Sequence, residues 1–168
     1  MSGFELRPAR KSDLSRLQLI SAQARERYRS IPELAHIADA PPLPPDRFEA
    51  CRVEVAARLD DPEPIGFAAT RTLDGLLYLD NISVVADASG RGIGSALLSS
   101  VIDHAAMLLA PAVSLTTFKQ PAWNGPWFRR HGFQPMHADQ IGVGLRGVME
   151  RQEQTLDPDS RETLVRFL

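Results

Sequence analysis

The chain has 168 residues, 43% of them hydrophobic and 24% charged, which is enough to form one globular domain with a buried core. A formal net charge of −2 and the absence of a basic stripe on any predicted helix argue against nucleic-acid binding. No run of about 18 apolar residues is present and the first residues lack the apolar stretch of a signal peptide, so we expect no membrane partner and a cytoplasmic location.

The first third of the chain predicts a strand, a helix and an irregular segment. Residues 4–8 are typical of a strand, and Ser12 is the predicted N-cap of a helix whose apolar residues share one face. Between residues 28 and 45 this periodicity stops. A short helical turn fits 33–38, and the proline-rich run that follows it opposes regular structure. The next stretch, 48–59, fits both a helix and a strand.

A hairpin and a longer α/β stretch follow. Residues 60–64 predict a turn, and Asp74 with Gly75 predicts a tight two-residue hairpin between two strands. Helical spacing resumes after residue 92, where apolar residues stand three and four apart. The remaining predicted elements are, in chain order, strands at 65–73, 76–85 and 112–117, a short strand after Phe133, a helix opening near Asp139 and a final strand at 164–168.

The most informative motif joins the strand at 76–85 to the helix after it. It reads Ser-Gly-Arg-Gly-Ile-Gly-Ser-Ala and occupies residues 89–96. Glycines at 90, 92 and 94 carry no Cβ atom that would hold a ligand away, so successive backbone N–H groups can converge on a pyrophosphate at the helix N-terminus. The spacing differs from the dinucleotide fingerprint and from the Walker pattern, so it supports neither of those nucleotide-binding classes.

A second block follows at 123–133 and reads Trp-Asn-Gly-Pro-Trp-Phe-Arg-Arg-His-Gly-Phe. With the glycine loop it resembles the GNAT superfamily of acyl-CoA N-acyltransferases, whose motifs read Gln/Arg-x-x-Gly-x-Gly/Ala and roughly Asn-x-x-x-Tyr-x-x-x-Gly-Phe. The resemblance implies a single domain, residues 1–168, with a mixed α/β (α+β) fold: a central mixed, mostly antiparallel sheet with a bulged central strand, flanked by helices. It also favours a short helix before a strand at 52–58, and it makes residues 28–45 the variable segment that faces the substrate.

The same resemblance implies an N-acetyltransferase that moves an acetyl group from acetyl-CoA to a primary amine of a small molecule or peptide, by direct attack in a ternary complex. The residues that it assigns to acetyl-CoA are Ile82, Ser83, Val84, Ser89, Gly90, Arg91, Gly92, Ile93, Gly94, Ser95, Asn124 and Phe128. Two of them depart from the motifs. Ser89 stands at the Gln/Arg position, where Arg91 nearby adds charge, and Phe128 stands at the tyrosine position, whose hydroxyl would protonate the leaving thiolate.

The central strand carries the residues expected to act on the thioester and the amine. The phase of its apolar residues changes between Leu79 and Ile82, which predicts a β-bulge near Asp80. By the resemblance, the bulge frees backbone groups for the pantetheine arm, and the N–H of Val84 could polarise the thioester carbonyl.

Proton transfer needs a base for the amine and an acid for the thiolate. A primary amine is mostly protonated at neutral pH, and Asp80 is the candidate base; it could instead only support the bulge. Because Phe128 has no hydroxyl, the proton for the thiolate must come from Tyr78, from Tyr28 or from solvent.

The other polar residues leave several readings open. Asn124 is the predicted N-cap of the next helix, and the matching asparagine of the superfamily also approaches the pantetheine or phosphates. The four histidines lack metal-ligand spacing, so no metal is expected, and Cys51 is expected to be a structural thiol. A homodimer is left open. The departures at Ser89 and Phe128 keep one alternative to an enzyme, a non-catalytic acyl-CoA sensor or degenerate relative.

Overall fold

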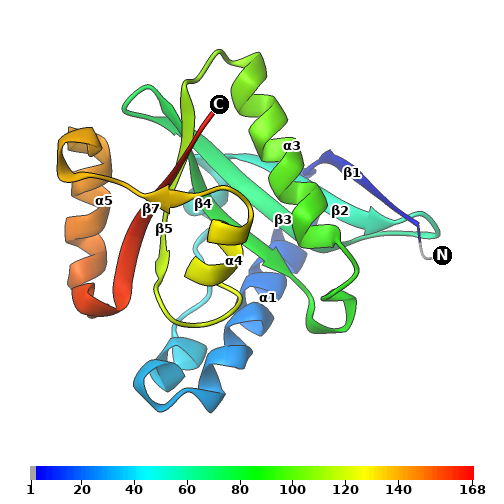
Figure 1. Cartoon of the computed structure of the whole chain (residues 1–168). Helices are drawn as coiled ribbons and strands as arrows, with labels where there is room; N and C mark the ends of the chain where they lie inside the picture. The colour runs from blue at the N-terminus through cyan, green and yellow to red at the C-terminus, as the bar shows by residue number, and fades with distance from the viewer. Residues whose placement is uncertain (1–2) are drawn as a thin grey trace. The chain divides into compact units, whose positions relative to one another are not determined.

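The computed structural model describes residues 3–168, which form a seven-stranded sheet flanked by helices (Figure 1). The strands are β1 (Phe4–Pro8), β2 (Arg52–Arg58), β3 (Asp61–Leu73), β4 (Leu76–Val84), β5 (Ala112–Phe118), β6 (Gln134–Pro135) and β7 (Arg161–Phe167). The α-helices are α1 (Leu14–Ala24), α2 (Pro45–Glu49), α3 (Ile93–Met107), α4 (Gly125–Arg130) and α5 (Val143–Glu153). Between them lie short 3-10 turns, among them Arg25–Ser30 and Pro32–Asp39.

The sheet is mixed. Its strand order is β1-β2-β3-β4-β5-β7-β6. The pairs β1/β2, β2/β3, β5/β7 and β6/β7 are antiparallel, and β4/β5 is parallel. The mixed α/β fold with a mostly antiparallel sheet is therefore confirmed.

The chain divides into two compact units. The first contains the residues up to Arg71 together with Asp80–Val101, and the second contains Thr72–Leu79 with Ile102–Leu168. The boundary passes through β4, between Leu79 and Asp80. The expectation of a single domain stays a prediction.

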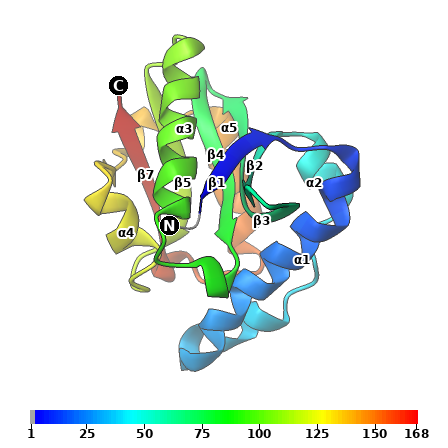
Figure 2. The ribbon, with the colours of Figure 1, turned by 90° about the vertical axis from the view of Figure 1, so that its right-hand side faces the viewer.

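In the first unit, β1, β2 and β3 form an antiparallel ladder. Helix α1 buries Leu17 and Ile20, which stand three residues apart as on one face of an amphipathic helix. Helix α2 lies beside β2 (Figure 2), and its Phe48 packs edge-on against Phe67 of β3 with ring centroids 5.5 Å apart. The short helix that the resemblance favours before β2 is thus present, and Pro45 occupies its first turn, where a missing N–H costs nothing.

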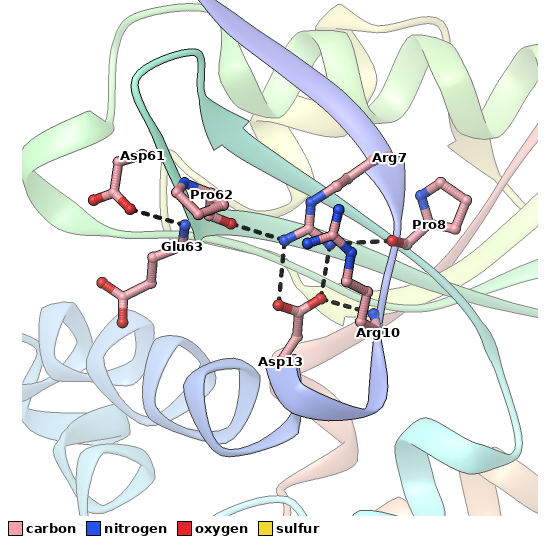
Figure 3. Close-up of polar contacts among 7 residues, drawn as sticks. All are labelled: Arg7, Pro8, Arg10, Asp13, Asp61, Pro62 and Glu63. Carbon is pink, nitrogen blue, oxygen red and sulfur yellow. Dashed lines mark hydrogen bonds and ion pairs between the residues drawn. The ribbon is translucent and has the colours of Figure 1, made fainter.

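A buried ion pair ties the start of α1 to β1 (Figure 3). Arg7 donates to both carboxylate oxygens of Asp13, at 2.8 and 3.2 Å, and to the carbonyl of Pro62 at 2.8 Å. Oδ2 of Asp13 also accepts the backbone N–H of Arg10 at 2.7 Å. The prediction that Ser12 caps the helix is wrong, because Ser12 lies inside a 3-10 turn and the carboxylate one residue later binds the N–H at the start of that turn.

The pKa of Asp13 lies below its ordinary value. Burial by itself raises the pKa of this carboxyl, but the hydrogen bonds from Arg7 and from the backbone of Arg10, with the charges of both arginines, outweigh burial and lower it. A carboxyl whose folded-state pKa is lowered contributes its full stability above the unfolded-state pKa of about 3.9, and this contribution is lost as the pH falls through the folded-state pKa.

Asp13→Asn is expected to lower the free energy of unfolding at pH 7 by about 3 kcal/mol, because it leaves the partly buried Arg7 without its charge partner. Urea denaturation at pH 7 and pH 3 measures the effect, and the difference from wild type should shrink at pH 3. An equal difference at both pH values would contradict a contribution from charge. Asp61→Asn is the control, since its exposed carboxylate accepts only the N–H of Glu63, and it should cost less than about 1 kcal/mol.

The turn between β2 and β3 is shorter than expected. Strand β3 begins at Asp61, so the predicted turn at 60–64 is wrong in most of its length. Register shifts at Ala56/Ala57 and Ala57/Arg58 explain the difference. A bulged ladder needs fewer N–H donors, which lets Pro62 and Pro64 lie within the strand.

The hairpin predicted at Asp74 and Gly75 is confirmed. Their φ angles are 55° and 79°, the left-handed values that a two-residue Asp-Gly turn requires. The same aspartate has a second role that the sequence did not indicate. Its two carboxylate oxygens accept the backbone N–H groups of Gly144 and Leu145, each at 2.8 Å, so Asp74 satisfies the N-terminal donors of α5 from a distant part of the chain.

In the second unit, β7 pairs with β5 on one side and with β6 on the other. It begins at Arg161, three residues before the predicted position, because its pairing with β5 extends to Phe118. Helix α5 runs beside β7 (Figure 1), and its Leu145 and Val148 pack around the buried ring of Tyr78. The helix expected near Asp139 is a 3-10 turn there, and α5 itself starts at Val143.

Candidate active site

The glycine loop has the geometry that its sequence predicts. Gly90 and Gly92 have φ angles of 79° and 81°, and residues 89–92 are exposed between the 3-10 turn Ala86–Ala88 and α3. The carbonyl of Gly92 accepts the N–H of Ala96 at 2.9 Å, so the first turn of α3 follows directly. Its first N–H groups, starting with Ile93, have no acceptor within the helix, and this arrangement can bind an anion.

The end of β4 is held in place by short contacts within the first unit. The N–H of Val85 donates to the carbonyl of Ile65 at 2.9 Å, and the hydroxyl of Ser83 donates to Oδ1 of Asn81 at 2.7 Å. The hydroxyl proton of Ser83 is thus already engaged, and its oxygen can still accept a hydrogen bond. Ile82 and Val84 are half-buried.

The expected bulge in β4 stays a prediction. Leu77, Tyr78 and Leu79 are each less than 5% exposed, so the first half of the strand is covered on both faces. An apolar run that is covered on both faces does not alternate, so the phase change in the sequence is only weak support for a bulge.

Asp80 lies between two arginines. Its side chain is 9% exposed, Oδ2 lies 2.8 Å from Nη2 of Arg47 in α2, and Oδ1 lies 3.9 Å from Nε of Arg71 in β3. No sequence motif indicated either arginine. A carboxylate held in this way is fixed in position, and it can accept a proton only where a donor reaches one of its remaining lone pairs.

Cys51 lies near the same charges. Burial and the negative charge of Asp80 raise the pKa of its thiol to about 11, although Arg71 and Arg47 act in the opposite direction. The thiol is therefore protonated at neutral pH, which fits a structural role and not a nucleophilic one.

The second unit contains the other three predicted site residues, Tyr78, Asn124 and Phe128. Phe128 is 6% exposed and packs edge-on against Trp127 and Phe133, with centroids 5.0 and 5.6 Å apart. Asn124 stands at the N-cap position of α4, as predicted, but the cap is made by its backbone: the carbonyl accepts the N–H of Phe128 at 3.1 Å, and no side-chain cap bond forms.

Tyr78 is a core residue, 2% exposed, whose hydroxyl oxygen lies 3.5 Å from that of Thr116. Tyr78→Phe is expected to change kcat by less than about threefold, because a contact this long contributes little and the ring already fills its site. Initial rates and thermal denaturation measure both effects. A much larger loss of kcat at unchanged acetyl-CoA affinity would instead make Tyr78 the proton donor.

A cavity of about 240 Å³ lies in the second unit, next to residues that pack against the cluster of Tyr78. Met136, Ile141 and Met149 line its apolar wall and also pack against the cluster of Tyr78. On the polar side, Nη2 of Arg161 donates to Oγ1 of Thr116 at 3.1 Å. No residue predicted for the site lines this cavity.

Arg25, which follows α1, has two guanidinium nitrogens that are buried without a hydrogen-bond partner, Nε and Nη2. Its Nη1 donates to the carbonyl of Pro41 at 3.0 Å. Burial lowers the pKa of this guanidinium. Since an unsatisfied buried donor costs about 1–3 kcal/mol, the side chain destabilises the fold at this position.

Arg25→Met is expected to raise the free energy of unfolding by about 1 kcal/mol, because methionine keeps the apolar stem and removes the unsatisfied donors. Urea denaturation measures the change. Arg29→Met is the matched control, since exposed Arg29 pairs with Glu26 and Asp39, and it should give no gain. A loss of stability in the Arg25 variant would mean that its bond to Pro41 outweighs the buried donors.

Comparison with protein families identifies the chain. Residues 52–135, half of the chain, match the family described as the acetyltransferase (GNAT) domain. The chain belongs to this family. It is therefore classed with the acyl-CoA-dependent acetyltransferases, and the matched region contains β2 to β6 with the glycine loop.

Solved structures share the fold at low sequence identity. A GNAT-family acetyltransferase from Staphylococcus aureus is 15% identical over 99% of both chains, with a TM-score of 0.72. The PaiA N-acetyltransferase from Thermoplasma acidophilum, solved with coenzyme A, is 13% identical over 99% of both chains, with a TM-score of 0.70. N-acetylglutamate synthase from Neisseria gonorrhoeae, solved with coenzyme A and N-acetyl-glutamate, is 19% identical over 100% of this chain and 36% of that one, with a TM-score of 0.69.

Two kinds of feature are absent from residues 3–168. Within this range no helix has the length and apolar character needed to cross a bilayer. The same residues contain no group of three or more His, Cys, Asp or Glu side chains placed to hold a metal ion.

Proposed function

We propose that this acetyltransferase is an N-acetyltransferase that moves an acetyl group from acetyl-CoA to a primary amine by direct attack in a ternary complex. The observation that carries the proposal is the exposed glycine loop in front of α3, in which Gly90 and Gly92 have positive φ angles at the N-terminus of a helix. The coenzyme A complexes of the Thermoplasma and Neisseria proteins support a CoA-based cosubstrate.

The loop and the end of β4 would hold acetyl-CoA. N–H groups of Arg91 to Ser95 would bind the pyrophosphate, and main-chain atoms of Ile82, Ser83 and Val84 would pair with the pantetheine arm. The open space around Gly90 and Gly92 fits this role, because a Cβ built at either position meets no heavy atom within 4 Å. Asn124 and Phe128 of the second unit stay predictions for acetyl-CoA binding, and the side chain of Phe128 is buried.

Asp80 would take one proton from the ammonium group, directly or through one water, and the amine nitrogen would then attack the thioester carbon. The N–H of Val84 would stabilise the negative charge on the carbonyl oxygen. When this tetrahedral intermediate collapses, the C–S bond breaks and the nitrogen gives its second proton to solvent. Solvent also protonates the thiolate, whose thiol has a pKa of about 8.5, so the thiolate leaves without an obligatory acid.

A second candidate function is acyl-CoA binding without turnover. The structure favours it at one point: Phe128 is buried among aromatic rings and supplies no proton. Initial rates measured over a grid of acetyl-CoA and amine concentrations distinguish the alternatives. Intersecting double-reciprocal lines support direct attack, parallel lines would indicate a covalent enzyme intermediate, and tight acetyl-CoA binding without a rate would identify a sensor.

A further inference from the structure

The side chains around the predicted base combine one buried negative charge with two positive charges that reach solvent. Asp80 is 9% exposed, whereas Arg47 is 46% exposed and Arg71 is 30% exposed. Together these three side chains carry a net charge of +1. A ligand that approaches Asp80 from solvent therefore meets guanidinium groups before it meets the carboxylate.

This order of charges matters for an amine acceptor. A primary amine arrives as an ammonium ion, which two guanidinium groups repel at short range. An acceptor that carries an anionic group beside its amine avoids this cost, since the anion can pair with a guanidinium while the ammonium pairs with the carboxylate. Charge complementarity of this kind selects partners chiefly by disfavouring those that lack the matching charge.

Arg47 is the arginine placed to bind such an anion. It stands in α2, its side chain is more exposed than that of Arg71, and its Nη2 lies 2.8 Å from Oδ2 of Asp80. Arg71 lies within β3, and its Nε is 3.9 Å from the other carboxylate oxygen. Arg71 can hold Asp80 in place while Arg47 turns to a ligand.

Resting on the proposed function, we propose that the acetyl acceptor is an amine with a carboxylate or phosphate group close to its nitrogen. Arg47 binds the anion and releases Oδ2 of Asp80, which then accepts a proton from the ammonium group. Because Arg47 and Asp80 are in hydrogen-bond contact, the amine and the anion must lie only a few bonds apart. An α- or β-amino acid or a phosphorylated amino alcohol meets this condition.

Matched acceptor pairs test the proposal. Each common L-amino acid is compared with its amide, and phosphoethanolamine with ethanolamine, by initial rates with acetyl-CoA; the two sets separate a carboxylate from a phosphate. The anionic member of at least one pair should have a kcat/KM at least about tenfold higher. If the members that lack the anionic group react equally well or better in every pair, the proposed substrate class is wrong, although acetyl transfer to an amine still holds.

Variants of Arg47 test its role. Arg47→Gln should raise KM for the preferred anionic acceptor by about 10- to 100-fold. The rate with the member of the pair that lacks the anionic group should change by less than about threefold. Arg47→Lys should restore part of the affinity for the anionic acceptor. Arg16→Gln, which removes the Arg16–Glu63 pair outside residues 28–45, should change neither. An equal loss for both members of a pair would mean that Arg47 only positions Asp80, and would overturn the proposal.

Calorimetric titration of the same pairs into the CoA-bound protein provides a readout that does not depend on turnover. If the anionic member binds more tightly but no acetyl transfer is measured, the transferase function is rejected and the proposed ligand class is kept. Equal binding of both members would reject the ligand class.

Discussion

Asp80→Asn is expected to lower kcat/KM for the amine by a factor of about 10² to 10⁴, the usual contribution of general-base catalysis. Acetyl-CoA affinity should remain within about twofold of wild type, because Asp80 contacts arginines and not the glycine loop. The rate of the variant should also rise more steeply with pH, since only the fraction of amine that is already deprotonated can react. Initial rates from pH 6 to pH 9, with calorimetry for acetyl-CoA, measure both effects.

The Arg16–Glu63 pair is the matched control for this experiment. Glu63 lies 3.8 Å from Arg16 in the same unit and outside residues 28–45, so Glu63→Gln removes a paired carboxylate away from the site. It should leave the rate unchanged. If Asp80 only supports the local structure, Asp80→Asn should lower the midpoint of thermal unfolding, acetyl-CoA affinity and rate together. A folded Asp80→Asn protein with wild-type turnover would reject the catalytic role.

Gly92→Val is expected to weaken acetyl-CoA binding by about 10- to 100-fold, which corresponds to the loss of one or two hydrogen bonds to a charged phosphate. Gly92 has a φ angle of 81°, which a β-branched residue avoids, so the backbone should shift and move the N–H groups of the following turn. Calorimetric titration with acetyl-CoA measures the affinity.

Gly75 provides the control for backbone strain. Its φ angle is 79°, and a Cβ there also meets nothing within 4 Å, but it lies in the β3–β4 hairpin. Gly75→Val should therefore cost stability without weakening acetyl-CoA binding. Equal affinity losses in both variants would show that the effect is general destabilisation, and unchanged affinity in Gly92→Val would reject the phosphate role of the loop.

Local signals in the sequence predicted the fold well wherever a single local preference determines the structure. The Asp74-Gly75 turn, the strand at Phe4–Pro8 and the loop before α3 all follow from backbone preferences of a few adjacent residues. The predicted N-cap at Ser12 is wrong because the next residue, Asp13, binds the N–H of Arg10 instead and is held by Arg7 of β1. The cap of α5 by Asp74 joins residues 70 apart, which no local rule can reveal.

Only part of the candidate site could be predicted, because local signals do not reveal side chains that come from distant elements. The glycine loop and Asp80 could be found from a motif and a strand position, whereas Arg47 and Arg71 reach Asp80 from α2 and β3. One of them left a usable signal. A two-residue turn at 74 and 75 fixes the register of the hairpin, and that register puts Arg71 on the same face as Asp80. Arg47 left none, since the path of the proline-rich segment could not be predicted.

Release of CoA thiol from acetyl-CoA, followed in the presence of the matched amine panel and with mass spectrometric identification of the products, tests acetyl transfer to an amine most directly. We expect thiol release that depends on both the protein and an amine, in equal amount with the N-acetylated amine. Acetyl-CoA binding in the glycine loop with no acetylated product from any amine, or thiol release with acetate as the product, would rule out acetyl transfer to an amine.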